Sequence, residues 1–92
     1  MKYALAAMLL LATGITAAQE PLRVGSKRFT ESYILGEIVA QAARAAGTQA
    51  EHKPGLGNTG IVFAALKAGS IDLYPEYTGT IAKEILKLEG DA

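Results

Sequence analysis

Apolar positions recur along the chain with two periods, and together they predict strands alternating with helices. Short apolar runs bounded by proline or polar residues predict strands over residues 22–26, 48–53 and 70–74. Apolar residues spaced three and four positions apart predict helices over residues 31–46, 59–68 and 80–88. The order β-α-β-α-β-α is typical of an α/β fold, in which helices cover a largely parallel sheet.

The ends and faces of the helices can also be predicted. Thr30 is the expected N-cap of the first helix and Gly47 its expected stop. Asn58 or Thr59 is the expected cap of the second helix, and Gly69 its expected stop. The first helix carries one apolar stripe, which comprises Ile34, Leu35, Ile38, Val39, Ala42 and Ala43. Such a stripe is the face that a helix turns toward the protein core.

The connections predict where a ligand binds. Right-handed crossovers place the carboxyl ends of parallel strands along one rim of the sheet, where open α/β sheets bind their ligands. The loops that follow the three predicted strands, residues 26–30, 54–58 and 75–80, should therefore meet at this rim.

The first residues have the pattern of an export signal. Lys2 gives a positive start, residues 4–15 are almost entirely apolar, and small residues follow up to Ala18. The run is shorter than the roughly 20 residues that span a bilayer, although an uncleaved anchor is an alternative. We expect cleavage after about Ala18, which divides the chain into a signal peptide (1–18) and a mature region (19–92) in the periplasm.

Composition narrows the possible functions. The sequence has no Cys, which excludes thiolate metal sites, a catalytic thiol and a lipid anchor on Cys. The mature region has eight Lys and Arg against nine Asp and Glu, a balance that gives no support to nucleic-acid binding. His52, the single His, is expected as an exposed strand residue, and Asp72 as a loop-fixing or helix-capping carboxylate. We expect no catalysis, cofactor or metal.

Two loops of the predicted rim carry side chains suited to ligand recognition. Residues 74–80 place two Tyr and two Thr in an irregular loop, and Tyr rings attract cations through their faces. Residues 26–30 place a Lys–Arg pair beside a helix start, where a cation can hold a carboxylate. The alternatives are Tyr rings that only pack, which we expect for Tyr74, and solvated charges.

Residues 55–60 spell the GxGxxG pattern of dinucleotide-binding turns, with Glu76 near the expected distance of the ribose acid. In those turns an apolar strand runs directly into the first glycine, whereas here polar residues lead to Pro54. A flexible glycine-rich turn before the second helix explains the same letters, and a nucleotide-using enzyme is kept as an alternative.

Three segments, residues 24–31, 55–59 and 65–80, resemble the glycine betaine, choline and carnitine-type substrate-binding proteins of osmoprotectant ABC importers. The resemblance implies a type II periplasmic-binding-protein fold, in which two α/β lobes close on the ligand, and an aromatic cage around a trimethylammonium group. It implies Tyr77 as a cage residue and Lys27 and Thr80 as contacts of the ligand's carboxylate. It also implies a quaternary ammonium ligand and an ABC permease as partners.

The resemblance covers the N-terminal part of the first lobe. Members of this family continue through a second lobe that adds cage residues, whereas this sequence ends at Ala92. We therefore expect a truncated form whose open cage binds betaine weakly or not at all. A small secreted interaction module, which pairs its apolar helix faces with another chain, is a further alternative.

Overall fold

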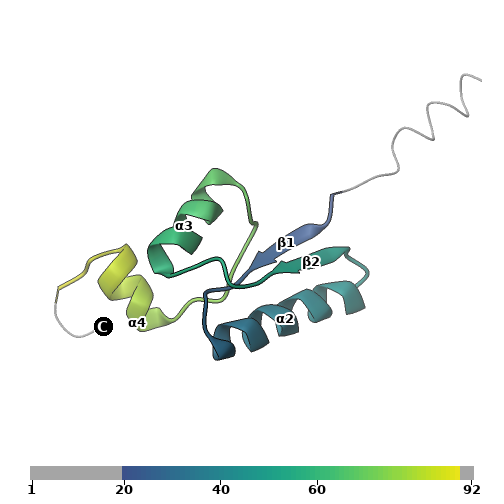
Figure 1. Cartoon of the computed structure of the whole chain (residues 1–92), viewed down its shortest axis with the longest axis horizontal. Coiled ribbons are helices and arrows are strands. Elements are labelled where there is room, and N and C mark those ends of the chain that lie inside the picture. Colours follow the sequence, from purple (N-terminus) through teal and green to yellow (C-terminus); the bar gives the residue numbers. More distant parts are fainter. Residues whose placement is uncertain (1–19, 90–92) are drawn as a thin grey trace, which may run out of the picture.

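The computed structural model describes residues 20–89, so the predicted signal peptide and its cleavage site lie outside the described residues. The described elements are β1 (Leu22–Gly25), α2 (Thr30–Ala45), β2 (Ala50–Lys53), α3 (Thr59–Ala68), α4 (Thr78–Thr80) and a π-helix, η1 (Ile81–Ile85). α2 connects the two strands and packs against both of them (Figure 1). β1 and β2 are parallel and pair from Leu22–Ala50 to Gly25–Lys53, so the predicted α/β class with a parallel sheet is confirmed.

The predicted third strand is reduced to a single contact. Of residues 70–74, Leu73 forms one parallel bridge with Val24 on the free side of β1. The carboxylate of Asp72 accepts the backbone N–H of Arg23 at 2.8 Å and pairs with its guanidinium at 3.1 Å. Because a side-chain oxygen takes an N–H group that a neighbouring strand would use, the ladder does not extend. Asp72 fixes this segment to β1, as predicted.

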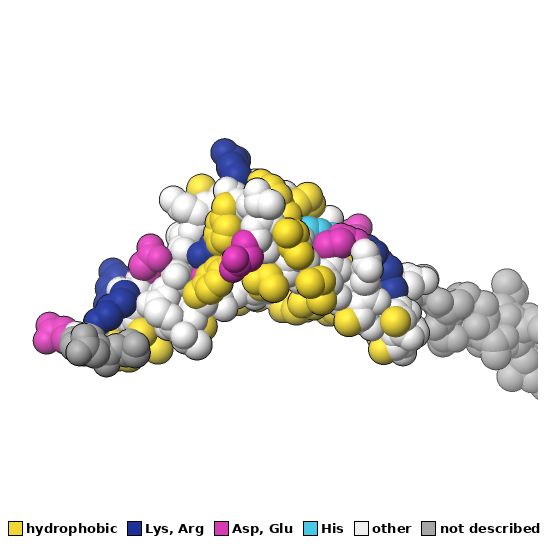
Figure 2. All heavy atoms as spheres, turned by 90° about the horizontal axis from the view of Figure 1, so that it is seen from below, with side chains coloured by type: hydrophobic (Ala, Val, Ile, Leu, Met, Phe, Trp, Pro, Cys, Tyr) yellow, Lys and Arg dark blue, Asp and Glu magenta, His cyan; other side chains and the backbone are white. Residues whose placement is uncertain are grey.

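The helix α2 turns a different face to the sheet from the one predicted. Its buried residues are Ser32, Gly36 and Ala40, whereas Ile34 and Ile38 are 55% and 58% exposed. A Cβ atom at position 36 would lie 2.6 Å from a ring nitrogen of His52, so only glycine permits this close approach of helix and strand. The small face therefore packs, and hydrophobic side chains gather on the surface on the α2 side of the molecule (Figure 2).

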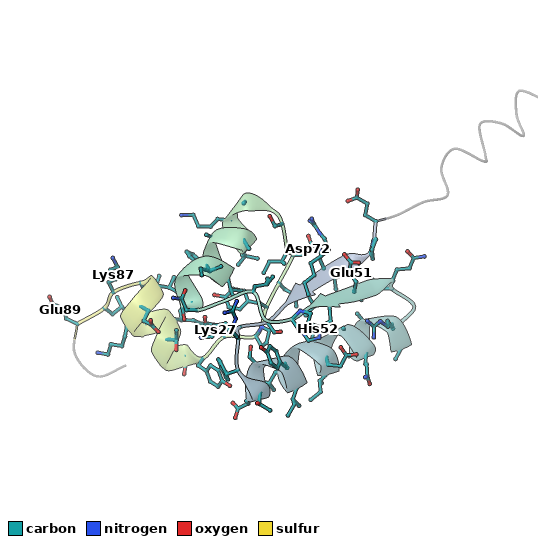
Figure 3. All side chains as sticks on the ribbon, in the orientation of Figure 1. Lys27, Glu51, His52, Asp72, Lys87 and Glu89 are labelled. Atoms are coloured by element: carbon teal, nitrogen blue, oxygen red, sulfur yellow. The ribbon has the colours of Figure 1, made fainter. Side chains whose placement is uncertain are left out.

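His52 is not the exposed strand residue that we predicted. Its side chain is 9% exposed and lies between β2 and α2 (Figure 3). One ring nitrogen is 2.8 Å from the hydroxyl of Ser26, and the other is 2.9 Å from the carboxylate of Glu37. The sequence around His52 did not predict this position, because the space that the ring occupies is left by Gly36 on α2.

The helix ends follow the local signals in part. Asn58 caps α3 by accepting the N–H of Ile61 at 3.1 Å, and Gly69 ends it in the left-handed region at φ 79°, as predicted. The predicted cap Thr30 is wrong: Phe29 is the N-cap of α2 and makes no side-chain bond there. Gly47, just beyond α2, has φ 92°.

The last predicted helix, residues 80–88, is shorter than expected, and most of it has the wider turn of a π-helix. It begins as α4 and continues as η1, where the N–H of Leu86 reaches back five residues to Ile81. Lys87 lies in the left-handed region at φ 55°, and the N–H of Leu88 bonds to the carbonyl of Ala82. A residue in the left-handed region just past the last turn is a common helix end, so the helix stops before Leu88.

The core of the described residues is small, and its side chains come from one strand, from the helices and from the segment after α3. Its fully or nearly buried apolar side chains are Val24, Ala40, Val62, Ile71 and Ala82. The contact is close at β1, since a Cβ atom at Gly25 would lie 2.7 Å from the end of Ile71. Within residues 20–89, no helix has the length and hydropathy needed to span a membrane.

Candidate functional site

The loops at the strand ends meet at one edge, as the parallel topology predicts. The N–H of Arg28 donates to the carbonyl of Gly57 at 3.0 Å, and the N–H of Leu56 donates to Ser26 at 3.1 Å. These bonds join the loop after β1 to the turn before α3. The segment that follows the Leu73 bridge completes the edge through Glu76, which pairs with Lys27.

Lys27 is the buried cation of this edge. It is 7% exposed, and it lies where the loops from the strand ends meet (Figure 3). Its Nζ donates to Glu76 at 2.7 Å and to the hydroxyl of Thr59 at 3.0 Å. Its backbone N–H donates to the hydroxyl of Ser32 at 2.9 Å, which holds the loop against the first turn of α2. An ammonium has three N–H donors, so one remains for a ligand.

Glu76 neutralises the charge of Lys27 and also accepts hydrogen bonds from two residues of its own loop. Besides Lys27, its carboxylate accepts the N–H of Tyr77 and the hydroxyl of Tyr74, each at 3.0 Å. Burial acts to raise the pKa of Glu76, but the bonds from Lys27, Tyr77 and Tyr74 outweigh it, so the pKa lies below its usual range. Burial and the bond to Glu76 raise the pKa of Tyr74 to about 12.

Two aromatic rings stand beside the ammonium. The Nζ of Lys27 lies 5.6 Å from the ring centre of Phe29 and 5.8 Å from that of Tyr77, both within cation–π range. The two ring centres are 6.1 Å apart and tilted by 30°. The hydroxyl of Tyr77 donates to Glu31 at the start of α2, and this bond is the main cause that raises the pKa of Tyr77 to about 12.

An open cavity of about 500 Å³ adjoins this cluster. Its lining residues come from the loop after β1 and from the start of α3: Lys27, Arg28, Phe29, Gly57, Asn58, Thr59 and Ile61. Arg28 is exposed there and has no ion-pair partner among residues 20–89. The cavity therefore offers one exposed ring, one free guanidinium and the remaining donor of Lys27.

The structure thus brings Lys27 and Tyr77 together, with the Nζ of Lys27 5.8 Å from the ring centre of Tyr77. Thr80 is half-buried at the end of α4, and within residues 20–89 its side chain makes no hydrogen bond with either residue. Tyr77 lies beside Phe29 rather than on the lining of the cavity. The assignment of these three residues as ligand contacts stays a prediction.

Sequence reasoning did not find the pairing of Glu76 with Lys27 or the roles of Phe29 and Thr59. All four residues lie within segments that we singled out, but their contacts depend on side-chain directions that loop sequences do not specify. Within the described part of the chain, no group of three or more His, Cys, Asp or Glu is arranged to hold a metal ion.

The fold and this edge define a class: an α/β lobe with a candidate ligand cavity at the carboxyl ends of parallel strands. Residues 20–92 match the family described as the substrate binding domain of ABC-type glycine betaine transport system, OpuAC. The chain belongs to this family.

Three curated relatives cover most of this chain. It is 43% identical over 75 residues to the glycine betaine-binding protein YehZ of Escherichia coli, and the match covers 82% of this chain and 24% of YehZ. It is 42% identical over 71 residues to a glycine-betaine-binding protein of Pseudomonas aeruginosa, covering 77% and 22%. It is 39% identical over 70 residues to EgtU of Helicobacter pylori, an ergothioneine transport permease and binding protein, covering 75% and 13%.

A solved structure agrees with these relatives. Apo YehZ from Escherichia coli superposes with a TM-score of 0.71 at 40% identity, covering 79% of this chain and 26% of that one. The periplasmic-binding-protein type of lobe is thereby confirmed. The chain spans about a quarter or less of the length of the relatives that it matches.

Proposed function

We propose that this chain is part of an extracytoplasmic substrate-binding protein that delivers quaternary ammonium solutes, such as glycine betaine and choline, to an ABC permease. The family and the names of the relatives support the class of ligand. In this proposal the N-terminal signal directs export to the periplasm and is cleaved after about Ala18, and the protein performs no catalysis.

The observation that carries the proposal is the exposed ring of Phe29 on the lining of a cavity that also holds two cations. Phe29 is 41% exposed, and a methylated ammonium can rest on an aromatic face without donating a hydrogen bond. Lys27 and Arg28 are both on the lining of the cavity, whose residues include no carboxylate, so the cavity favours the acidic end of a zwitterion. Tyr77 and Thr80 remain proposed ligand contacts beside Lys27.

This arrangement sets an order among ligands. Glycine betaine presents both a trimethylammonium group and a carboxylate, whereas choline lacks the carboxylate, so we propose tighter binding of glycine betaine. Because the chain spans about a quarter of its YehZ relative, the described residues supply one wall of the site. An exposed cation–π contact contributes only about 0.5–1 kcal/mol, so we propose that the described residues alone bind glycine betaine only in the millimolar range.

Magnetic resonance titration of the purified mature chain tests the proposal. Glycine betaine should shift the signals of Phe29 and Lys27, choline should shift them less, and 3,3-dimethylbutanoate, the uncharged-head isostere of betaine, should not shift Phe29. Phe29→Leu should abolish the response. Phe63→Leu is the matched control, because Lys67 stands 5.6 Å over that ring but the ring lies outside the cavity.

Two outcomes would count against the proposal. Equal shifts of the Phe29 signals from betaine and from 3,3-dimethylbutanoate, whose head group is uncharged, would show that the ring does not recognise the cation. A micromolar dissociation constant would show that a single wall suffices, which contradicts the proposed weak binding of this chain.

A second candidate is an interaction module that pairs its apolar helix face with another chain. The exposed side chains of Ile34 and Ile38 on α2 favour it. A stable dimer in gel filtration that Ile34→Ser dissociates would support this candidate, and a monomer at all concentrations would reject it.

A further inference from the structure

A second polar network lies directly behind the site and has no part in the proposed binding chemistry. It runs from Glu37 on α2 through His52 on β2 to Ser26 at the end of β1. Ser26 is fully buried, and His52 is partly buried, with a side chain that is 9% exposed. Figure 3 places His52 between β2 and α2, on the side of the strands where α2 packs.

The distances match those of a Ser–His–acid hydrolase triad, but access does not. The hydroxyl of Ser26 is 2.8 Å from His52, and His52 is 2.9 Å from Glu37. A nucleophile needs an open path to a carbonyl carbon, whereas Ser26 is 0% exposed and lines none of the described cavities. The network therefore acts on the fold and not on a substrate.

The hydrogen bonds assign the protons of this network. Within residues 20–89 the side chain of Ser26 bonds to His52 and to no other group, so its buried proton is satisfied only if it points at Nε2 of the ring. Nε2 must then be the acceptor, and Nδ1 carries the proton that goes to Glu37. The arrangement thus specifies a neutral imidazole, protonated on Nδ1.

The hydroxyl that His52 holds belongs to the residue before Lys27. The backbone of Ser26 donates to Lys53 at 3.2 Å and accepts from Leu56 at 3.1 Å, so Ser26 joins β1, β2 and the turn before α3. Any movement of Ser26 passes directly to Lys27 and Phe29, which line the cavity.

We propose that His52 is a positioning residue for the ligand site, which holds the Ser26–Phe29 loop through Ser26 only while its ring is neutral. Protonation turns Nε2 into a donor and leaves the hydroxyl proton of Ser26 buried without an acceptor, so the loop must shift. The inference rests on the proposed ligand site, which gives the position of this loop its use.

None of the charged groups around the imidazole of His52 changes its charge in place of the ring or accepts the hydroxyl proton of Ser26. Glu37 faces His52 from α2, and the same carboxylate accepts from Gln41 and pairs with Arg44 at 3.3 Å. These bonds, that from Gln41 first and that from His52 next, keep the pKa of Glu37 below its usual range, so it stays ionised as an imidazole titrates. Glu51 and Lys53 on β2 are exposed and pair with each other, and the residue that follows β1, Ser26, is uncharged.

The test is a nitrogen–proton spectrum of the single imidazole of the mature chain, recorded between about pH 8 and pH 5, the range in which imidazoles change charge. At the upper end we expect the Nδ1–H form. As the ring titrates, the amide signals of Lys27 and Phe29 should move with the same midpoint. An Nε2–H form, or amide signals that ignore the titration, would overturn the proposal.

Two variants separate positioning from a merely structural role. Ser26→Ala keeps a titrating ring but removes the link, so the ring should titrate without moving the amides of Lys27 and Phe29. His52→Gln should leave these amides constant over the pH range, and Glu51→Gln, on the same strand but outside the network, should behave as the wild type. If coupled movement persists in Ser26→Ala, the link does not run through Ser26. Should either variant fail to fold, the proposal is still tested by the tautomer of His52 in the wild type and by the agreement of its titration midpoint with those of the Lys27 and Phe29 amide signals.

Ligand titration supplies the last measurement. Affinity for glycine betaine should be about two- to tenfold weaker at the acid end, the loss expected for one buried hydrogen bond, and independent of pH in His52→Gln. Equal affinity at both ends, with coupled amide signals, would overturn the effect on binding. Coupled signals with no binding at either pH would uphold the network and reject the proposed function.

Discussion

Replacing Glu76 with glutamine leaves Lys27 buried without its counter-charge. The two side chains are 7% and 8% exposed and 2.7 Å apart, so the remaining ammonium cannot regain its water without opening the edge. Removing one partner of a buried pair costs about 3–5 kcal/mol, and glutamine, which can still bond to Tyr77 and Tyr74, should lie near the lower value. A region of this size has a total stability of about 5 kcal/mol, so the variant should remain only marginally folded.

Urea unfolding followed by circular dichroism measures this loss. With a slope of about 1 kcal/mol per molar urea, the midpoint should fall by about 3 M at neutral pH. Lys27→Met combined with Glu76→Leu removes both charges and should recover much of the stability. Glu51→Gln is the matched control, because its pair with Lys53 spans 3.6 Å and both side chains are more than 40% exposed, so its midpoint should not move measurably.

The pH dependence gives an independent check. The folded pKa of Glu76 lies below its ordinary value of 4.5, so its stabilisation is complete above that pH and is lost as the pH falls through the folded pKa. The gap between wild type and Glu76→Gln should therefore close in acid. An unchanged midpoint at neutral pH, or an undiminished gap at about pH 2, would refute the buried-pair argument.

Three further predictions concern other parts of the described chain. Asn58→Ala should lower the free energy of unfolding of the mature chain by about 1 kcal/mol in urea unfolding, since α3 loses its cap, and Asn58→Asp should retain it. Gly36→Ala should lower the free energy of unfolding by about 1–3 kcal/mol, because the new Cβ atom would meet His52. Gly60→Ala should raise it by about 0.5–1 kcal/mol, because the nearest atom to its new Cβ would lie 3.6 Å away. A change of the same sign in both variants would contradict this account. In ultraviolet titration Tyr74 and Tyr77 should ionise at about 12, and Glu31→Gln should return Tyr77 toward 10.0; no change on that substitution would refute the assigned bond.

Sequence reasoning succeeded where a few neighbouring residues decide the outcome. Asn58 and Gly69 bound α3 because a cap and a left-handed stop act within one turn of helix. The parallel sheet and the meeting of its loops followed from the alternation of strands and helices, since chain topology leaves few other arrangements.

The remaining errors share one cause, which is packing between distant segments. The buried face of α2 depends on the contact of Gly36 with His52, sixteen positions away, and this contact outweighed the apolar stripe that periodicity favoured. The partner of Lys27 is 49 positions along the chain, and neither loop specifies it alone. Leu73 pairs at one point because the carboxylate of Asp72 occupies the next position of the ladder.

The backbone bonds from Arg28 to Gly57 and from Leu56 to Ser26 use no side chain. The frame of the cavity therefore tolerates exchange of lining residues such as Arg28 and Ile61 without being rebuilt. If the proposed site binds a solute, such a division between a fixed main-chain frame and replaceable wall residues would let a lineage change that solute by point substitution while it keeps its architecture.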